Sequence, residues 1–186
     1  MAAYGPLARI YDDLTYDVDY GQFADFYEKI FISRGKKVRT LLDLGCGTGT
    51  LTMLMAKRGY ELIAADASED MLCVAQEKSM ELAGVTPPMF LCQSMTELDL
   101  YGTVDAAVSC LDSFNYLPPE DVPRLLHLLH LFIEPDGIFI FDINSPERLR
   151  SLDGYISVDE DENKLCLWRA DFYESENALF YGMDIF

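Results

Sequence analysis

Residues 41–50 read LLDLGCGTGT and join an apolar run to the start of a helical pattern. The alternating glycines Gly45, Gly47 and Gly49 let the backbone turn tightly and come close to a ligand. The helix that follows directs its first N–H groups toward the same space. This stretch therefore predicts a ligand-binding turn at the carboxyl end of a buried strand, where open α/β sheets bind their ligands.

Strands and helices alternate on both sides of this turn. We expect helices over residues 22–34, 50–58, 69–83 and 119–134, and strands over residues 38–44, 61–65, 89–92, 104–110 and 137–143. Such alternation indicates a parallel sheet, and the right-handed crossover rule makes the fold doubly wound, with helices on both faces. The predicted fold class is α/β with a mostly parallel sheet.

The tail of the chain breaks this rhythm. Residues 164–173 and 178–186 form two aromatic-rich runs without a helical period, which predict an antiparallel ribbon with a solvated acidic turn at 159–162. We therefore expect a core over residues 1–150, which includes an N-terminal lid segment, and a ribbon over residues 151–186. Because the apolar pattern runs to the last residue, we expect a C-terminally shortened form of a longer chain.

Composition limits the classes of function. The chain has 186 residues, half of them hydrophobic, and a formal net charge of −18 at pH 7. This charge repels phosphate backbones, so we expect no nucleic-acid partner and no anionic membrane surface. The sequence has no run of 18 apolar residues, and residues 1–14 have no apolar core, so we expect neither a transmembrane helix nor a signal peptide.

Cysteines and histidines give no sign of chemistry. The five cysteines lack disulfide or metal-ligand spacing and lie among apolar residues, which predicts buried thiols, no metal site and a cytoplasmic location. They are Cys46, Cys73, Cys92, Cys110 and Cys166. We expect His127 and His130 on the exposed polar stripe of an amphipathic helix.

Two acids strengthen the prediction for the glycine turn. Asp43 lies inside the apolar strand, where a carboxylate needs a partner, either a ligand ammonium or the N–H groups of the turn. Asp66 ends the second strand, where it can accept hydrogen bonds from a ribose diol or start the helix beside Ser68. Thr50 stands where the dinucleotide pattern G-x-G-x-x-G requires glycine, which counts against a nicotinamide cofactor.

With these residues, the sequence resembles the class I S-adenosylmethionine-dependent methyltransferases. Residues 43–49, DLGCGTG, match the first motif of that superfamily, and Asp66 matches its ribose-binding acid. The stretch from Tyr4 to Asp12 is similar to the start of bacterial small-molecule methyltransferases. The resemblance implies a Rossmann-like core and S-adenosylmethionine as cofactor, with S-adenosylhomocysteine as product. It also implies in-line methyl transfer to a nitrogen, oxygen or carbon atom of a small-molecule acceptor.

The same resemblance assigns roles to individual residues. It places cofactor contacts at Tyr11, Asp43, Gly45, Cys46, Gly47, Asp66, Ala67, Met71, Gln93, Ser94, Met95, Leu111 and Asp112. Ser94 departs from the pattern, because many members have an acid there to meet the adenine amino group. The lid candidates are Tyr11, Tyr16, Phe114 and Tyr116. No catalytic base is assigned, although Tyr11, Asp112, Tyr116 and Asp142 are candidates to accept a proton.

Two other functions stay open at this point. One is a cofactor-binding protein of the same fold without turnover, since the last two strands and last helix of the superfamily have no counterpart here. The other is a nicotinamide-dependent oxidoreductase on a similar sheet.

Overall fold

The computed structural model describes residues 5–160 and 165–186 and divides into two compact units, Met1–Ile143 and Asn144–Phe186. This division falls before the predicted boundary at residue 150, so the short helix α7 (Pro146–Arg150) belongs to the second unit. Each unit has its own sheet.

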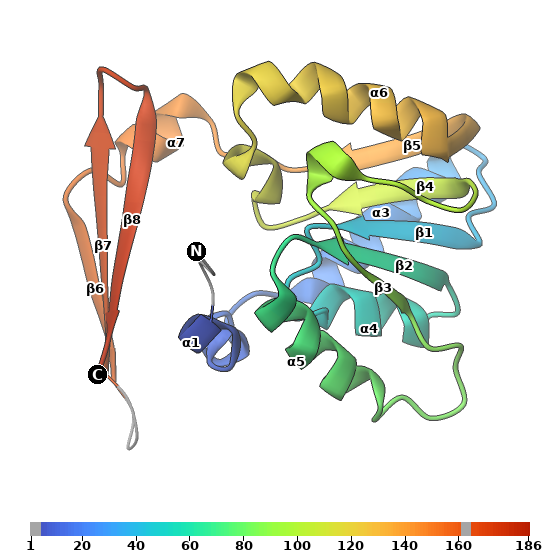
Figure 1. The fold of residues 1–186 in the computed structure, drawn as a ribbon, viewed down its shortest axis with the longest axis horizontal. Coiled ribbons are helices and arrows are strands. Elements are labelled where there is room, and N and C mark those ends of the chain that lie inside the picture. The colour runs from blue at the N-terminus through green and yellow to red at the C-terminus, as the bar shows by residue number, and fades with distance from the viewer. Residues whose placement is uncertain (1–4, 161–164) are drawn as a thin grey trace. The chain divides into compact units, whose positions relative to one another are not determined.

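The first unit is built on a five-stranded parallel sheet with the order β3-β2-β1-β4-β5 (Figure 1). Its strands are β1 (Thr40–Leu44), β2 (Glu61–Asp66), β3 (Met89–Cys92), β4 (Val104–Ser109) and β5 (Ile133–Phe141). The chain passes from β1 outward to β3 and then returns to β4, so the strand order reverses between β1 and β4. Ligands bind at such a reversal in doubly wound sheets. The predicted α/β fold class is confirmed.

Helices precede and connect these strands. They are α1 (Gly5–Ala8), α2 (Tyr11–Leu14), α3 (Tyr20–Ser33), α4 (Thr50–Lys57), α5 (Glu69–Ser79) and α6 (Val122–Phe132), with 3-10 turns η1 (Met95–Glu97), η2 (Ser113–Tyr116) and η3 (Pro119–Asp121). Gly35, with φ +65°, follows the end of α3 in the left-handed conformation that is typical of a glycine after a helix. The Ser68 side chain caps α5 by accepting a hydrogen bond from the Met71 N–H, as predicted. The helix α5 ends at Ser79, earlier than expected.

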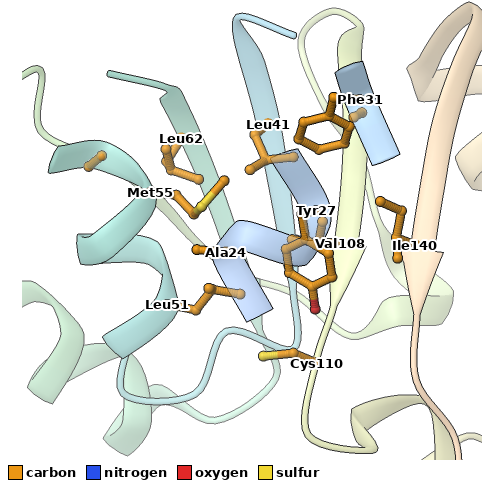
Figure 2. Packing of buried hydrophobic residues seen from close by; sticks show 12 residues of the cluster. Ala24, Tyr27, Phe31, Leu41, Leu51, Met55, Leu62, Val108, Cys110 and Ile140 are labelled. Carbon is orange, nitrogen blue, oxygen red and sulfur yellow. The ribbon is translucent and has the colours of Figure 1, made fainter. Parts of the chain in front are cut away.

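Each face of the sheet has its own apolar cluster, because successive residues of a strand point to opposite faces. Figure 2 shows Tyr27 and Phe31 of α3 packed with Met55 of α4 over Leu41 of β1. The next residue, Leu42, belongs instead to the cluster that contains Leu125 and Leu129 of α6, Leu98 and Leu100. The strand β1 is thereby buried on both sides, which places its carboxyl end in the centre of the fold.

The connection into β5 differs from its prediction. The helix expected to continue to Glu134 ends at Phe132, because Ile133 already pairs with Val104 of β4. The backbone then turns through Asp136, which has φ +63°, before Ile138 pairs with Ala106. The predicted strand from Gly137 is thus the second part of a longer, interrupted strand.

The second unit is an antiparallel sheet of three strands in the order β6-β7-β8. They are β6 (Tyr155–Glu160), β7 (Leu165–Tyr173) and β8 (Ala178–Ile185). The predicted ribbon is confirmed for the last two strands, but β6 was missed. Its residues are mostly exposed, and its acidic end, expected as a turn, pairs Asp159 with Cys166. The other half of that acidic run, residues 161 and 162, lies outside the described residues.

Several predictions about side chains can be compared with this fold. Cys110 and Cys166 are buried and Cys46 is half-buried, but Cys73 and Cys92 are exposed, so the expectation of burial was wrong for these two. All five thiols are free. His127 and His130 are exposed on α6, as expected. Among residues 5–160 and 165–186, no helix has both the length and the apolar character needed to cross a membrane.

Candidate functional site

A cavity of about 730 Å³ lies in the first unit, next to the glycine turn and the ends of β2 and β4. Twelve residues predicted for the site line it: Tyr11, Gly45, Gly47, Asp66, Ala67, Met71, Gln93, Ser94, Met95, Leu111, Asp112 and Tyr116. Lining residues that the sequence analysis did not name are Thr15, Val18, Ala65, Thr96, Ser113, Leu117, Pro118 and Asp121. Four predicted residues are not part of the lining: Asp43 and Cys46 of the cofactor contacts, and Tyr16 and Phe114 of the lid candidates.

Backbone hydrogen bonds to β2 hold the glycine turn in place. The N–H groups of Gly45 and Cys46 both donate to the Ala65 carbonyl, at 2.8 and 3.1 Å. Gly45 and Gly47 have φ values of +77° and +54°, a region that residues with a Cβ rarely adopt. A Cβ on Gly45 would lie 2.8 Å from the Ser113 Cβ, whereas one on Gly47 would meet no atom within 4 Å. Only Gly47 therefore presents open space above its backbone.

Asp66 joins the turn to the next helix. Its Oδ2 accepts a hydrogen bond from the Gly47 N–H, and its Oδ1 accepts one from the Ser68 N–H, both at 2.8 Å. The predicted role at the helix start is thus present, and the bond from the Gly47 N–H adds a structural role that was not predicted. Because each carboxylate oxygen can accept more than one hydrogen bond, the group still has acceptor capacity toward the cavity that it lines.

Asp43 lies behind the turn, in the buried core. Its Oδ2 accepts a hydrogen bond of 2.5 Å from the Thr52 hydroxyl, and its Oδ1 is buried without a partner among the described residues. Burial raises the pKa of Asp43 to about 6, against the opposing effect of the Thr52 hydrogen bond. The structure therefore does not bring Asp43 to the cavity wall. Its partner is the Thr52 hydroxyl of α4, whereas the N–H groups of Gly45, Cys46 and Gly47 donate to Ala65 and Asp66.

Cys46 has no feature of a nucleophile. Burial, followed by the nearby charges of Asp43 and Asp66, raises the pKa of its thiol far above the ordinary value. Since the thiolate is the reactive form, this thiol is inert at neutral pH.

The segment after β3 forms one wall of the cavity. The Gln93 side chain braces its own loop, because its amide donates to the Asp99 carbonyl and accepts from the Asp99 N–H. The Ser94 hydroxyl caps η1 by accepting from the Thr96 N–H at 3.3 Å. This Ser-x-Thr cap was a local signal that the sequence analysis did not use. Both side chains therefore have structural partners while they line the cavity.

The wall after β4 is strained. Leu111 and Asp112 both have positive φ, +53° and +50°, which costs about 1 kcal/mol or more at each non-glycine position. A carboxylate from the end of β5 holds this turn, since Asp142 Oδ2 accepts from the Asp112 N–H at 2.8 Å. The other oxygen of Asp142 is buried without a described partner. Paired left-handed residues at a cavity wall are typical of a functional site.

The lid candidates separate into two groups. Tyr11, the first residue of α2, and Tyr116, at the end of η2, line the cavity. Tyr16 is not part of the lining and is 81% exposed. Phe114 also lies outside the lining and stacks on Phe141, with 4.5 Å between the ring centroids. Of the four lid candidates, Tyr11 and Tyr116 line the cavity. Tyr4 lies outside the described residues.

Neither a second cavity nor a metal-ligand cluster adds a candidate site among the described residues. A cavity of about 690 Å³ lies between Ile30, Arg34 and Lys36 on one side and residues 136–141 on the other, and it contains none of the predicted residues. Within the part of the chain that the structure describes, no three His, Cys, Asp or Glu side chains are grouped as a metal site would require.

Comparison with known proteins gives a consistent result. The model of a methyltransferase domain family matches residues 41–137. YqeM of Bacillus subtilis, provisionally named a methyltransferase, is 31% identical over 186 residues, which cover 98% of this chain and 72% of YqeM. A ubiquinone biosynthesis O-methyltransferase of Chromobacterium violaceum is 36% identical over 63% of this chain and 48% of its own.

A solved structure agrees with these relatives. The crystal structure of an S-adenosylmethionine-dependent methyltransferase from Clostridium acetobutylicum superposes with a TM-score of 0.79 at 28% identity. The match covers 98% of this chain and 79% of that protein.

Proposed function

This chain belongs to the class I S-adenosylmethionine-dependent methyltransferases, and from that premise we propose how its cavity holds the cofactor and which acceptors it admits. The enzyme uses S-adenosylmethionine and transfers a methyl group. The finer assignments below concern single residues and the chemical class of the acceptor.

The residues of the cavity fit the cofactor. Gly47 has open space above its Cα, where a ligand can come close to the backbone. Asp66 keeps acceptor capacity for the two ribose hydroxyls while the Gly47 and Ser68 N–H groups fix its orientation. In this proposal Gly45 and Gly47 border the methionine part, and Tyr11 meets its carboxylate. Ala67 and Met71 flank the adenine.

When bound, the cofactor supplies a methyl group activated by a sulfonium centre. What the chain must add is orientation, since in-line displacement needs the acceptor atom about 3 Å from the methyl carbon and collinear with the breaking bond. Tyr11 and Tyr116, which line the same cavity, are placed to exclude water over it. Their aromatic faces also suit a sulfonium cation.

The charge of the cavity supports an acceptor that is neutral or cationic. Its lining includes three carboxylates, Asp66, Asp112 and Asp121, and no Lys, Arg or His among the described residues. The whole chain carries a formal charge of −18. Because an anionic acceptor would enter against this field, we propose a neutral or cationic small molecule that receives the methyl group on nitrogen, oxygen or carbon. The ubiquinone O-methyltransferase relative is a precedent for a small-molecule acceptor.

The experiment is transfer of a labelled methyl group from S-adenosylmethionine to a panel of small amines, phenols, carboxylates and phosphorylated compounds. We expect product from amines or phenols and none from the anionic compounds. Transfer confined to the anionic compounds would contradict the proposed acceptor class. Cofactor binding with no transfer to any compound would favour a cofactor-binding protein without turnover.

The same charge supports the absence of a nucleic-acid partner, since a phosphate backbone would be repelled. The cytoplasmic location expected from the cysteine pattern stays a prediction.

A further inference from the structure

Four side chains from three distant segments meet beside the cavity. Asp12 comes from α2, Thr48 and Thr50 from the glycine turn and the start of α4, and Lys78 from the end of α5. Asp12 Oδ1 accepts from the Thr48 hydroxyl at 2.6 Å and from the Thr50 hydroxyl at 3.1 Å. Lys78 Nζ lies 2.6 Å from Asp12 Oδ2 and 2.7 Å from the Thr50 hydroxyl oxygen. We refer to these four residues as the Asp12–Lys78 network.

The protons of this network can be assigned. A carboxylate only accepts and an ammonium only donates, so each threonine hydroxyl donates its single proton to Asp12 and accepts from Lys78. Burial acts to raise the pKa of Asp12. The hydrogen bonds from Lys78, Thr48 and Thr50 and the positive charge of Lys78 outweigh burial, so the pKa of Asp12 is lowered. The Asp12 carboxylate is therefore charged, and each of the four side chains has a hydrogen-bond partner within the network.

Its surroundings distinguish it from an ordinary surface ion pair. The side chains of Lys78 and Asp12 are 27% and 42% exposed, and both contact Thr48, which is buried. An isolated exposed pair is worth about 0–1 kcal/mol and leaves its partners mobile. Here the pair is anchored to a buried hydroxyl within the glycine turn, so it ties the N-terminal segment to a rigid part of the fold.

The three segments that the network joins are also three walls of the cavity. Tyr11 is adjacent to Asp12, and Thr15 and Val18 follow in the same segment. Gly47 is adjacent to Thr48, and Met71 lies on the helix that carries Lys78. Fixing Asp12 to Thr48 and Lys78 therefore fixes the Tyr11 wall relative to the glycine turn.

We propose that Asp12 and Lys78 are positioning residues, which hold the Tyr11-bearing segment against the glycine turn so that the cavity keeps the shape that binds the cofactor. The consequence for cofactor affinity rests on the proposed function, whereas the consequence for the order of residues 11–18 does not. These two consequences are measured separately.

The experiment compares Asp12→Asn, Lys78→Met and the double variant with the wild-type chain. Asp17→Asn is the matched control, because Asp17 lies on the same segment and is exposed. Calorimetric titration with S-adenosylhomocysteine measures affinity. Hydrogen exchange of peptides over residues 11–18 measures order, since the Leu14 and Thr15 N–H groups donate to Ile10 and Tyr11. Thermal unfolding reports the stability of the whole fold.

We expect each single variant to weaken the affinity about tenfold and to speed exchange over residues 11–18, with little change in the unfolding temperature. The double variant should bind S-adenosylhomocysteine as tightly as the single variant with the lower affinity, because either substitution alone breaks the network. Lys78→Arg, which keeps the charge, should recover part of the affinity. Asp17→Asn should match the wild type in both measurements.

Unchanged exchange in Asp12→Asn and Lys78→Met would overturn the proposal. So would an affinity loss that follows a general loss of stability, which indicates a merely structural role. If Asp12→Asn fails to fold, Thr50→Val removes one hydroxyl of the network and must produce the same local effect. If the wild-type chain binds no S-adenosylhomocysteine, the proposed cofactor contacts fail, and the exchange data alone decide whether the network positions the segment.

Discussion

The wall made by the glycine turn and the wall made by Leu111 and Asp112 face the same cavity but are held in different ways. Three backbone N–H groups fix the glycine turn, two of them on the Ala65 carbonyl of a buried strand. The Leu111–Asp112 wall holds two non-glycine residues at positive φ, and side chains from Asp142 and Ser113 fix it.

This difference separates a part of the site that depends mainly on backbone hydrogen bonds from a part that depends on particular side chains. The two bonds to the Ala65 carbonyl do not depend on side-chain identity, and the third needs the Asp66 carboxylate, so this wall depends on its glycines and on Asp66. The Leu111–Asp112 wall depends on a few particular side chains, which makes it easy to reshape. The first suits a cofactor shared by a family. The second, where Leu111 and Asp112 are predicted to contact the cofactor, also suits an acceptor that differs among family members.

The largest effect should come from a Cβ at the tightest point of the glycine turn. Gly45→Ala places that atom 2.8 Å from the Ser113 Cβ at φ +77°, so we expect about a 100-fold loss of S-adenosylhomocysteine affinity by calorimetry. Gly84→Ala is the control, because Gly84 has the same φ and no neighbour within 4 Å. Equal affinities of the two variants would show that close packing of the turn is unimportant.

A smaller effect should follow when the carboxylate behind the other wall is removed. Asp142→Ala leaves the Asp112 N–H without its acceptor, so the strained turn relaxes and transfer falls about tenfold. Asp142→Asn, which keeps one acceptor oxygen, should lose less. Steady-state kinetics and calorimetry should show a larger change in the acceptor KM than in the cofactor Kd. A loss confined to the cofactor Kd would remove the distinction between the two walls.

The smallest effect concerns the acid buried behind the glycine turn. The folded state raises the pKa of Asp43 from 3.8 to about 6, so it binds the proton more tightly than the unfolded chain does. The stability linked to this proton is complete below about pH 4 and is lost as the pH rises through 6. Urea unfolding should show the wild type losing about 1 kcal/mol relative to Asp43→Asn between pH 5 and pH 7. A constant difference between the two proteins would indicate that Asp43 does not titrate in this range.

The same division explains what could be predicted from the sequence. The glycine turn, Asp66 and the strand β3 carry local patterns, and the structure places all of them as expected at the cavity or in the sheet. The position of Asp43 behind the turn was less predictable, because a buried carboxylate has the same local pattern whether it faces a ligand or a threonine.

Other features depend on contacts without a local pattern. Asp12 and Lys78 are far apart in the sequence, and each alone resembles an ordinary surface charge. The strand β6 is mostly exposed and ends in Asp159 and Glu160, residues that are typical of a solvated turn. The strained pair Leu111 and Asp112 includes a leucine, a residue type that gives no indication of positive φ.

The central claim is that the cavity beside the glycine turn binds S-adenosylmethionine through Asp66. The most direct measurement is calorimetric titration of S-adenosylhomocysteine into the wild-type chain, Asp66→Ala and the control Glu69→Ala, whose side chain is exposed at the start of α5. The account predicts micromolar binding to the wild type, a loss of about tenfold or more (about 1.4 kcal/mol) in Asp66→Ala, and no loss in Glu69→Ala. Equal binding to Asp66→Ala and the wild type would contradict it.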